Sequence, residues 1–354
     1  MKITAIEYFR LDMPLAIPYK IAYETVSKTS NIILKLTTDT GPTGWGCAAP
    51  DPEVTGETAE DVIQNIESIL IGLLKNQSPF QIARINHELK KLCPKASSTM
   101  AMVDIALYDI MARKARLPLY QLLGGYRSEI PTSITIGILS LKETIEQASY
   151  YLKKGFSIIK LKGGLHIEED IEKILKLRER YGDAFLLRFD ANQGYTHEET
   201  IEFINKTQSA NIEIFEQPTK LKKEEQLDET SQNIGVPIMA DESMKTLKDA
   251  FRMANNDLID MVNIKVMKVG GITEAKHINS VAKASGMEVM VGCIDECSLG
   301  ISAGLHFALS RPNIEFADLD GHLDLLEDPF TDLFQLKKGI LYPSKAYGLG
   351  KITL

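Results

Sequence analysis

The sequence predicts an α/β protein built as a (β/α)8-type barrel with an additional α+β capping domain. Two observations indicate the barrel. After residue 125, eight short β-rich runs alternate with helical patterns at a spacing of about 25 residues, which is typical of parallel strands joined by helices. None of these runs is followed by the G-x-G-x-x-G turn of an open, dinucleotide-binding sheet. The 354 residues suffice for such a barrel and a second domain.

Residues 1–125 are predicted to form the capping domain, with lid loops. Strand patterns occupy 2–11 and 30–46, and the second contains the turn-forming run TTDTGPTG. The segments 14–29 and 47–58 show no clear periodicity or are rich in proline and glycine, so we expect two long loops there. Apolar residues recur at helical spacing in three segments, 58–74, 78–92 and 98–115.

Residues 126–326 are predicted to form the barrel, and 327–354 are expected to return to the capping domain. The strand-like ends of the last segment favour that return. The eight β-rich runs of the barrel are 132–138, 157–164, 185–194, 212–219, 236–243, 261–271, 288–296 and 314–320.

The composition is that of an ordinary globular chain, with 44% hydrophobic and 25% charged residues and no apolar run long enough to cross a bilayer. A net charge of −8 and the lack of a basic cluster argue against a nucleic-acid surface. The N-terminus resembles no targeting peptide, and Cys293 and Cys297 lack a second pair at zinc-binding spacing. We therefore expect a cytoplasmic protein without nucleic-acid or membrane partners; a homo-oligomer is compatible with the sequence.

Three acidic residues recur at one place in consecutive units of the predicted barrel. Asp190, Glu216 and Asp241 each end a strand-like run, and they are 26 and 25 residues apart. The carboxyl ends of barrel strands meet at one face. Three carboxylates there cannot all stay ionised unless a positive charge offsets them, and Mg²⁺ prefers oxygen ligands. The row predicts one Mg²⁺ per chain, with helix capping as the alternative for any single acid.

Lysines flank this acidic row on both sides. Lys160 and Lys162 belong to the preceding strand and, being two residues apart, point to the same face. The strand after the row offers Lys265 and Lys268, and we expect Lys268 to face away or to be solvated at the strand end. A lysine pair can also protect a sheet edge. Next to a predicted metal site, however, the pair favours an inward position facing anionic groups.

A metal beside a substrate carboxylate, with an amine on each side, suits removal of the proton next to that carboxylate. Lys160 and the cation would favour the neutral amine of Lys162, which is the form that accepts a proton. Two bases on opposite faces permit racemisation or epimerisation, whereas a single base would indicate β-elimination or cycloisomerisation. A Schiff-base lysine is the alternative, but that chemistry needs no row of three carboxylates.

Motifs spread over nearly the whole chain are typical of one family. They are GPTGWG at 41–46, VDIALYDIMARKARLPLYQLLGG at 103–125, K-x-K at 160–162, D-A-N at 190–192, E-Q-P at 216–218, D-E-S at 241–243 and N-I-K at 263–265. On these motifs the sequence resembles the enolase superfamily, muconate-lactonizing subgroup, and within it the dipeptide epimerases of the L-Ala-D/L-Glu type. Enzymes of this superfamily use a Lys or His base with Mg²⁺.

The resemblance implies a role for each matching residue. The three acids match the family's Mg²⁺ ligands. Lys162 and Lys265 match the two acid/base residues, Lys160 matches an electrostatic helper, and Lys265 is preferred to Lys268 because it belongs to the N-I-K motif. Other positions match the substrate pocket, where a D-x-D pair holds the N-terminal ammonium of the dipeptide: Thr135, Glu296, Cys297, Asp318 and Asp320. The family often has Ser or Thr at Cys297, so a backbone contact is expected there.

The resemblance therefore implies an isomerase that epimerises the C-terminal residue of a dipeptide, with L-Ala-L-Glu and L-Ala-D-Glu from murein peptides as the expected pair. One departure concerns the first cap loop, where Ala-Glu epimerases tend to carry an Arg and this chain has Glu24. Either Lys20 or Lys28 supplies the positive charge, or the preferred second residue is not acidic.

Two other functions remain compatible with the sequence. One is another activity of the subgroup, namely o-succinylbenzoate synthase, N-succinylamino-acid racemase or muconate cycloisomerase, whose substrates carry no free ammonium. The other is a barrel that binds metal without turnover.

Overall fold

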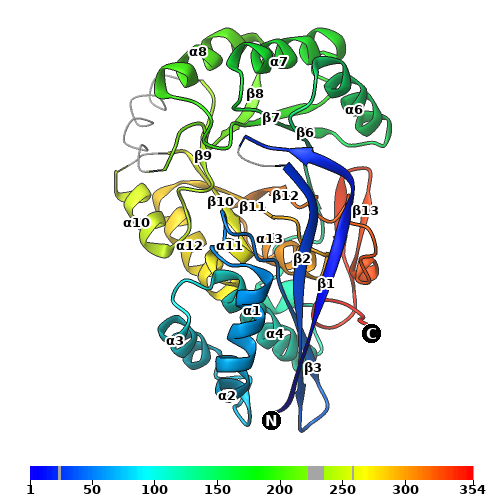
Figure 1. Ribbon diagram of the computed structural model, residues 1–354, viewed down its shortest axis with the longest axis vertical. Coiled ribbons are helices and arrows are strands. Elements are labelled where there is room, and N and C mark those ends of the chain that lie inside the picture. The colour runs from blue at the N-terminus through cyan, green and yellow to red at the C-terminus, as the bar shows by residue number, and fades with distance from the viewer. Residues whose placement is uncertain (23–24, 222–234, 257–258, 354) are drawn as a thin grey trace.

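The computed structural model describes residues 1–22, 25–221, 235–256 and 259–353 (Figure 1). These residues form one eight-stranded sheet and two three-stranded sheets. No helix among them is both long and apolar enough to cross a membrane.

The eight-stranded sheet is parallel, and its strands are adjacent in chain order. All eight predicted runs contain one of its strands: β5 (Ile134–Ile136), β6 (Ile158–Lys162), β7 (Leu186–Asp190), β8 (Ile212–Glu216), β9 (Ile238–Ala240), β10 (Met261–Lys265), β11 (Glu288–Gly292) and β12 (Ile314–Asp318). The first and last strands meet, since the N–H of Ser133 donates to the carbonyl of Ala317 at 3.2 Å. The predicted barrel is confirmed.

Helices cover the outside of the barrel, as Figure 1 shows. They are α6 (Leu141–Lys153), α7 (Ile167–Tyr181), α8 (His197–Thr207), α10 (Leu247–Asn256), α11 (Val266–Val269), α12 (Ile272–Ser285) and α13 (Ser298–Ala308). The connection from β8 to β9 includes 222–234, which lie outside the described residues. The described residues after β12 form no α-helix, so the eighth unit is a strand without a helix of its own.

Side chains alternate between the barrel interior and the surrounding helices, as a strand period of two requires. Phe189 points outward, and its ring stacks on Phe203 of α8 with centroids 4.4 Å apart. Its neighbours Arg188 and Asp190 point the other way, into the barrel. An apolar cluster inside the barrel consists of Ile214, Met239, Met261, Met290 and Phe316. The guanidinium of Arg188 packs against this cluster, 5.4 Å from the ring centroid of Phe316.

The capping sheet is antiparallel and consists of β1 (Ile3–Lys20), β2 (Thr25–Thr38) and β3 (Thr43–Ala48). The prediction of a loop over 14–29 is wrong, because β1 and β2 occupy most of that segment. Distant backbone stabilises the extension: the N–H of Ala16 donates to the carbonyl of Asp324 at 2.7 Å, and that of Leu326 to Pro14 at 3.0 Å. Propensity within the segment could not indicate these partners.

Three helical segments complete the cap, as the sequence predicts. The first runs through α1 (Ala59–Asn65), a π-turn over Ile66–Leu70 and α2 (Ile71–Leu74), followed by α3 (Ile82–Leu92) and α4 (Ser97–Ala115). Strand β3 packs directly on α4, because a Cβ at Gly46 would lie 1.9 Å from the carbonyl oxygen of Met102. The glycines of the GPTGWG run thus allow a close strand–helix contact.

The C-terminal segment crosses from the barrel to the cap. Strands β13 (Phe334–Lys337) and β14 (Ile340–Pro343) form a hairpin that pairs with β4 (Ile130–Pro131). Further on, the buried carboxylate of Asp109 in α4 accepts hydrogen bonds from the N–H of Leu349 at 2.8 Å and of Trp45 at 3.0 Å. One side chain of the cap helix therefore joins the capping sheet to the tail.

Candidate active site

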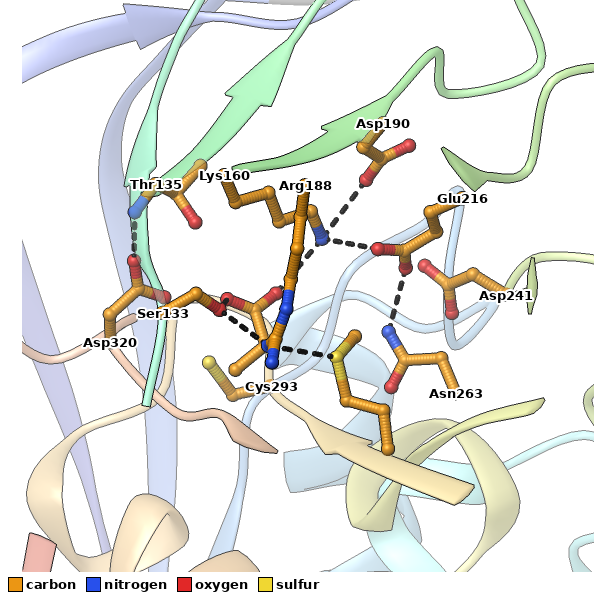
Figure 2. Close-up of polar contacts among 12 residues, drawn as sticks. Ser133, Thr135, Lys160, Arg188, Asp190, Glu216, Asp241, Asn263, Cys293 and Asp320 are labelled. Carbon is orange, nitrogen blue, oxygen red and sulfur yellow. Dashed lines mark hydrogen bonds and ion pairs between the residues drawn. The ribbon is translucent and has the colours of Figure 1, made fainter. Parts of the chain in front are cut away.

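Three buried carboxylates lie next to one another where consecutive barrel strands end (Figure 2). Asp190 ends β7, Glu216 ends β8 and Asp241 directly follows β9, and none is more than 2% exposed. In the sheet register, Asp190 pairs with Glu216. The structure therefore brings together the acidic row that the sequence predicts.

One ammonium group lies inside this cluster. Nζ of Lys160 is 2.5 Å from Oε2 of Glu216, 3.1 Å from Oδ2 of Asp190 and 2.9 Å from Oδ2 of Asp318. Burial alone lowers the pKa of Lys160, but these carboxylates outweigh burial and hold that pKa well above the usual lysine value. The acids that surround Lys160 therefore explain why its side chain points into the barrel.

The other two lysines stand at the two ends of the row. Nζ of Lys162 is 2.7 Å from Oδ2 of Asp190, and Nζ of Lys265 is 2.8 Å from Oδ2 of Asp241. Strands β6 and β10 are four positions apart in the eight-stranded order, so the two lysines come from opposite walls of the barrel. Both line the same cavity above the acids. Burial lowers the pKa of Lys265, but Asp241 and Glu216 outweigh burial and raise it well above its usual value.

The expectation for Lys268 is wrong. Its side chain is fully buried, and its Nζ donates to Oδ1 of Asp241 at 2.5 Å and to the carbonyl of Asn263 at 3.0 Å. Lys268 belongs to α11, the short helical turn after Lys265. A helical turn returns a residue three positions on to nearly the same side, whereas a strand would have turned it away.

The lysines compensate the three acids unevenly. Burial by itself raises the pKa of each acid. At Asp241 and Asp190, lysines at 2.5–2.8 Å outweigh burial, so the pKa of each of these two acids is lowered. For Glu216, burial and the charge of Asp190 prevail, and its pKa rises to about 7. Glu216 is therefore the acid of the row whose charge the lysines offset least, and a bound cation would stabilise its charged form.

The side chains of the row fit Mg²⁺ by their chemistry. All three offer hard oxygen ligands, and close by, Oε2 of Glu242 and Oδ1 of Asn263 have no partner among the described residues. Ammonium groups hold the carboxylates in this structure, and no three acidic, His or Cys side chains of the described part of the chain converge at metal distances. The fit to Mg²⁺ therefore rests on the chemical identity of these side chains, since the described residues do not form a preassembled metal site.

The two acids of the D-x-D pair differ in their partners. Asp318 accepts a hydrogen bond from the hydroxyl of Ser133 at 2.7 Å and faces Lys160. Asp320 accepts from the backbone N–H of Thr135 at 2.6 Å, and burial together with Asp318 raises the pKa of Asp320 to about 7. Both acids and Thr135 line the cavity. Asp320 is the one without an ion pair among the described residues.

The two candidates after β11 are buried beneath the cavity wall. Glu296 accepts from the N–H of Ile294 at 3.2 Å, and burial raises the pKa of Glu296 to about 8. The N–H of Cys297 donates to Oδ1 of Asn31 at 2.7 Å, and its Sγ lies 3.6 Å from that of Cys47. Both groups of Cys297 therefore contact the cap, and substrate contact by either residue remains a prediction.

Sequence reasoning missed several polar residues around the acidic row. The side-chain amide of Asn263 donates to Glu216 at 2.7 Å, and that of Asn192 donates to Glu242 at 3.3 Å. The buried guanidinium of Arg188 lies one layer deeper, as Figure 2 shows. It pairs with Glu213 at 2.7 Å. Asn263 and Arg188 occupy the inward positions two residues before Lys265 and Asp190, so strand periodicity could have identified them.

Neither lysine considered as a replacement for the missing arginine is part of the described lining of the cavity. Lys20 and Lys28 are both exposed, and neither is among the described residues that line it. Glu24 itself lies outside the described residues.

The comparisons with known proteins identify the class to which this fold and site belong. Residues 4–124 match the mandelate racemase / muconate lactonizing enzyme N-terminal domain, and residues 143–351 match the enolase C-terminal domain-like family. The chain therefore belongs to the enolase superfamily, muconate-lactonizing subgroup, as the motifs predict.

Relatives at 33–40% identity include epimerases and a racemase, which are isomerases. The L-Lys-D/L-Arg epimerase of Desulforapulum autotrophicum is 38% identical over 99% of both chains, and the L-Ala-D/L-Glu epimerase of Bacillus subtilis is 40% identical over 94% of this chain and 91% of the relative. A substrate-liganded structure of the Bacillus subtilis epimerase superposes with a TM-score of 0.96, covering 99% and 98% of the two chains. A dipeptide epimerase from Methylococcus capsulatus, solved with Mg and L-Arg-D-Lys, covers both chains fully at 34% identity and a TM-score of 0.95.

Proposed function

We propose that this protein is a Mg²⁺-dependent dipeptide epimerase that inverts the α-carbon of the C-terminal residue by a two-lysine 1,1-proton transfer. One observation carries the proposal: Lys162 and Lys265 reach one cavity from opposite walls, with the acidic row between them. Relatives solved with Mg and dipeptides support the same assignment.

Asp190, Glu216 and Asp241 would hold the ion. When bound, Mg²⁺ supplies positive charge beside the substrate carboxylate, which makes the neighbouring α-hydrogen more acidic. The buried position of these acids keeps water away from that charge and so strengthens its effect.

The two lysines perform the proton transfer. The amine on one wall accepts the α-hydrogen as a proton while the electron pair of the C–H bond moves toward the carboxylate. The ammonium on the opposite wall then donates a proton to the other face of the same carbon, which forms the new C–H bond and inverts the centre. Lys160, between Glu216 and Asp318, orients the carboxylate end of the substrate.

The D-x-D pair would bind the N-terminal ammonium of the dipeptide. Asp320 supports this role, because its carboxylate lines the cavity without an ion pair among the described residues. The succinylated or carboxylic substrates of other subgroup members carry no such ammonium. Asp320→Asn should therefore lower kcat/KM for dipeptides by about tenfold or more, while an unchanged value would favour an N-succinylamino-acid racemase or a related activity.

Hydrogen–deuterium exchange at the α-carbon tests the proposal. In D₂O with Mg²⁺, an active dipeptide should gain deuterium and lose its stereochemical purity, and removal of Mg²⁺ by a chelator should stop both. Lys162→Ala and Lys265→Ala should each lower epimerisation by about 100-fold or more, with Mg²⁺ affinity and thermal unfolding retained. Lack of exchange with every dipeptide tested, despite bound Mg²⁺, would reject the proposal.

The finer expectation, an Ala-Glu substrate from murein peptides, rests on the resemblance. The relatives include enzymes for Ala-Glu, for Lys-Arg and for hydrophobic dipeptides. Membership of the family therefore does not specify whether the substrate side chain is acidic, basic or apolar. The charged residues that line the cavity are the structural feature that bears on this question.

A further inference from the structure

The cavity above the acidic row contains many more acidic than basic side chains. The described lining residues include three lysines, all of them already assigned to the reaction centre, and seven acids. Four of these acids, Asp241, Glu242, Asp318 and Asp320, belong to the metal region or the D-x-D pair. The other three lie beyond it: Asp51, Asp295 and Asp324.

None of the lining lysines is available for an acidic substrate side chain. Lys160 is surrounded by three carboxylates within 3.1 Å, and Lys162 and Lys265 each pair with one acid of the row at 2.7 and 2.8 Å. The described lining residues include no arginine. A glutamate side chain would therefore meet no free counter-charge among the described lining residues, at a cost in binding.

Asp324 is well placed to select the substrate charge. It follows β12 in the loop that also carries Asp320, and its carbonyl accepts a hydrogen bond from Ala16 of β1 at 2.7 Å, which fixes the loop. Its half-buried carboxylate has no hydrogen bond or ion pair among the described residues. Burial raises the pKa of Asp324, and the nearby Lys154 opposes that shift only in part.

The surroundings of Asp324 are shaped for a long side chain with a polar end. Tyr151 of α6 lines the cavity together with Asp324 and Asp320, and burial and the charges of these two acids raise the pKa of Tyr151 above its usual value. The phenol ring thus lies close to both acids. Its apolar face can cover the methylene stem of a lysine or arginine while a carboxylate receives the charged end.

Two further acidic side chains line the cavity on its cap side. Asp51, in the loop after β3, accepts backbone hydrogen bonds from Glu53 at 2.8 Å and Val54 at 3.0 Å. Asp295, after β11, accepts from the hydroxyl of Tyr19 at 2.8 Å. These contacts hold both carboxylates in place at the cavity wall.

We propose that the cavity selects dipeptides with a basic side chain, lysine or arginine, and that Asp324 is the residue that determines this specificity. The inference rests on the proposed function, since it concerns the side chain of the same dipeptide substrate. A basic side chain would form a charge-assisted hydrogen bond with the Asp324 carboxylate, which has no hydrogen-bond partner among the described residues. A substrate carboxylate would meet like charge.

A matched panel of dipeptides tests the preference through kcat/KM for α-deuteration in D₂O. L-Ala-L-Lys, L-Lys-L-Ala and L-Lys-L-Lys represent the basic class, L-Ala-L-Leu the neutral class and L-Ala-L-Glu the acidic class. The best basic dipeptide should exceed L-Ala-L-Leu by about tenfold or more and L-Ala-L-Glu by about 100-fold or more. A preference for L-Ala-L-Glu or L-Ala-L-Leu would overturn the inference and leave the epimerase proposal standing. No exchange with any dipeptide would reject the epimerase proposal itself.

Variants test the role of Asp324. Asp324→Asn should lower the ratio of kcat/KM for the basic over the neutral dipeptide by about tenfold or more, and Asp324→Lys should raise the relative rate with L-Ala-L-Glu. Asp183→Asn, an exposed position after α7, is the matched control and should leave the ratio unchanged. A basic preference that persists unchanged in both Asp324 variants would overturn the assignment to Asp324.

Discussion

Replacing Lys268 with methionine tests how strongly the buried lysine network supports the acidic row. Methionine has a similar length but removes the charge and the donors of the ammonium group. In the native structure that group donates to Oδ1 of Asp241, to the carbonyl of Asp241 at 2.5 Å and to the carbonyl of Asn263 at 3.0 Å. The substitution leaves three buried oxygen atoms without these partners.

The expected loss follows from burial. Breaking a fully buried ion pair on one side costs about 3–5 kcal/mol, because the remaining charge stays desolvated. Asp241 keeps its second partner, Lys265 at 2.8 Å, so the loss should lie near the lower end, at about 3 kcal/mol. Lys206→Met is the matched control: Lys206 also pairs with two acids, but its side chain is 45% exposed, so the loss should stay below about 1 kcal/mol.

Urea-induced unfolding of metal-free protein at pH 7, followed by circular dichroism, measures both losses. Added Mg²⁺ should stabilise Lys268→Met more than the native chain, since a cation at Asp241 would replace the missing charge. Equal small losses for the two variants would refute the reasoning, because they would mean that burial does not strengthen this contact.

Two other predictions concern stability and loop geometry. Burial lowers the pKa of His306 to about 3, whereas its value in the unfolded chain is about 6.5. Between these two pH values only the unfolded chain takes up the proton. The contribution of His306 to the free energy of unfolding should therefore fall by about 2 kcal/mol from pH 7 to pH 5. His306→Asn should show a correspondingly shallower fall in pH-dependent urea unfolding; an identical slope would contradict the prediction. Gly164→Ala places a Cβ 2.1 Å from the carbonyl oxygen of Ala191 at a φ of +95° and should displace the loop after Lys162, lowering kcat at least about tenfold. At the control position Gly182, φ is +55° but no atom lies within 4 Å of an added Cβ. Gly182→Ala should therefore lose about 1 kcal/mol of stability and no activity. Equal kcat values for the two variants would contradict the prediction.

The candidate site was largely predictable because its signals are local. A strand alternates its side chains with a period of two, and a strand–helix unit repeats every 25 residues or so, so equivalent acids of successive units must meet. This reasoning placed Asp190, Glu216 and Asp241 together and turned Lys160 and Lys162 inward, as Figure 2 shows for four of these five. It failed at Lys268, where the chain changes from strand to helical turn within three residues.

The sequence by itself determined the barrel, the acidic row and the lysines on either side of it, because short-range periodicity specifies each of them. The tertiary structure alone decided the rest: that residues 14–20 extend a strand by bonding to 324–326, that Lys20 and Lys28 lie outside the cavity, and that Asp324 lines it. These features depend on segments about 300 residues apart in the chain. Contacts over such separations leave no periodic signal in either segment, so only the folded chain reveals the charge that a substrate side chain meets.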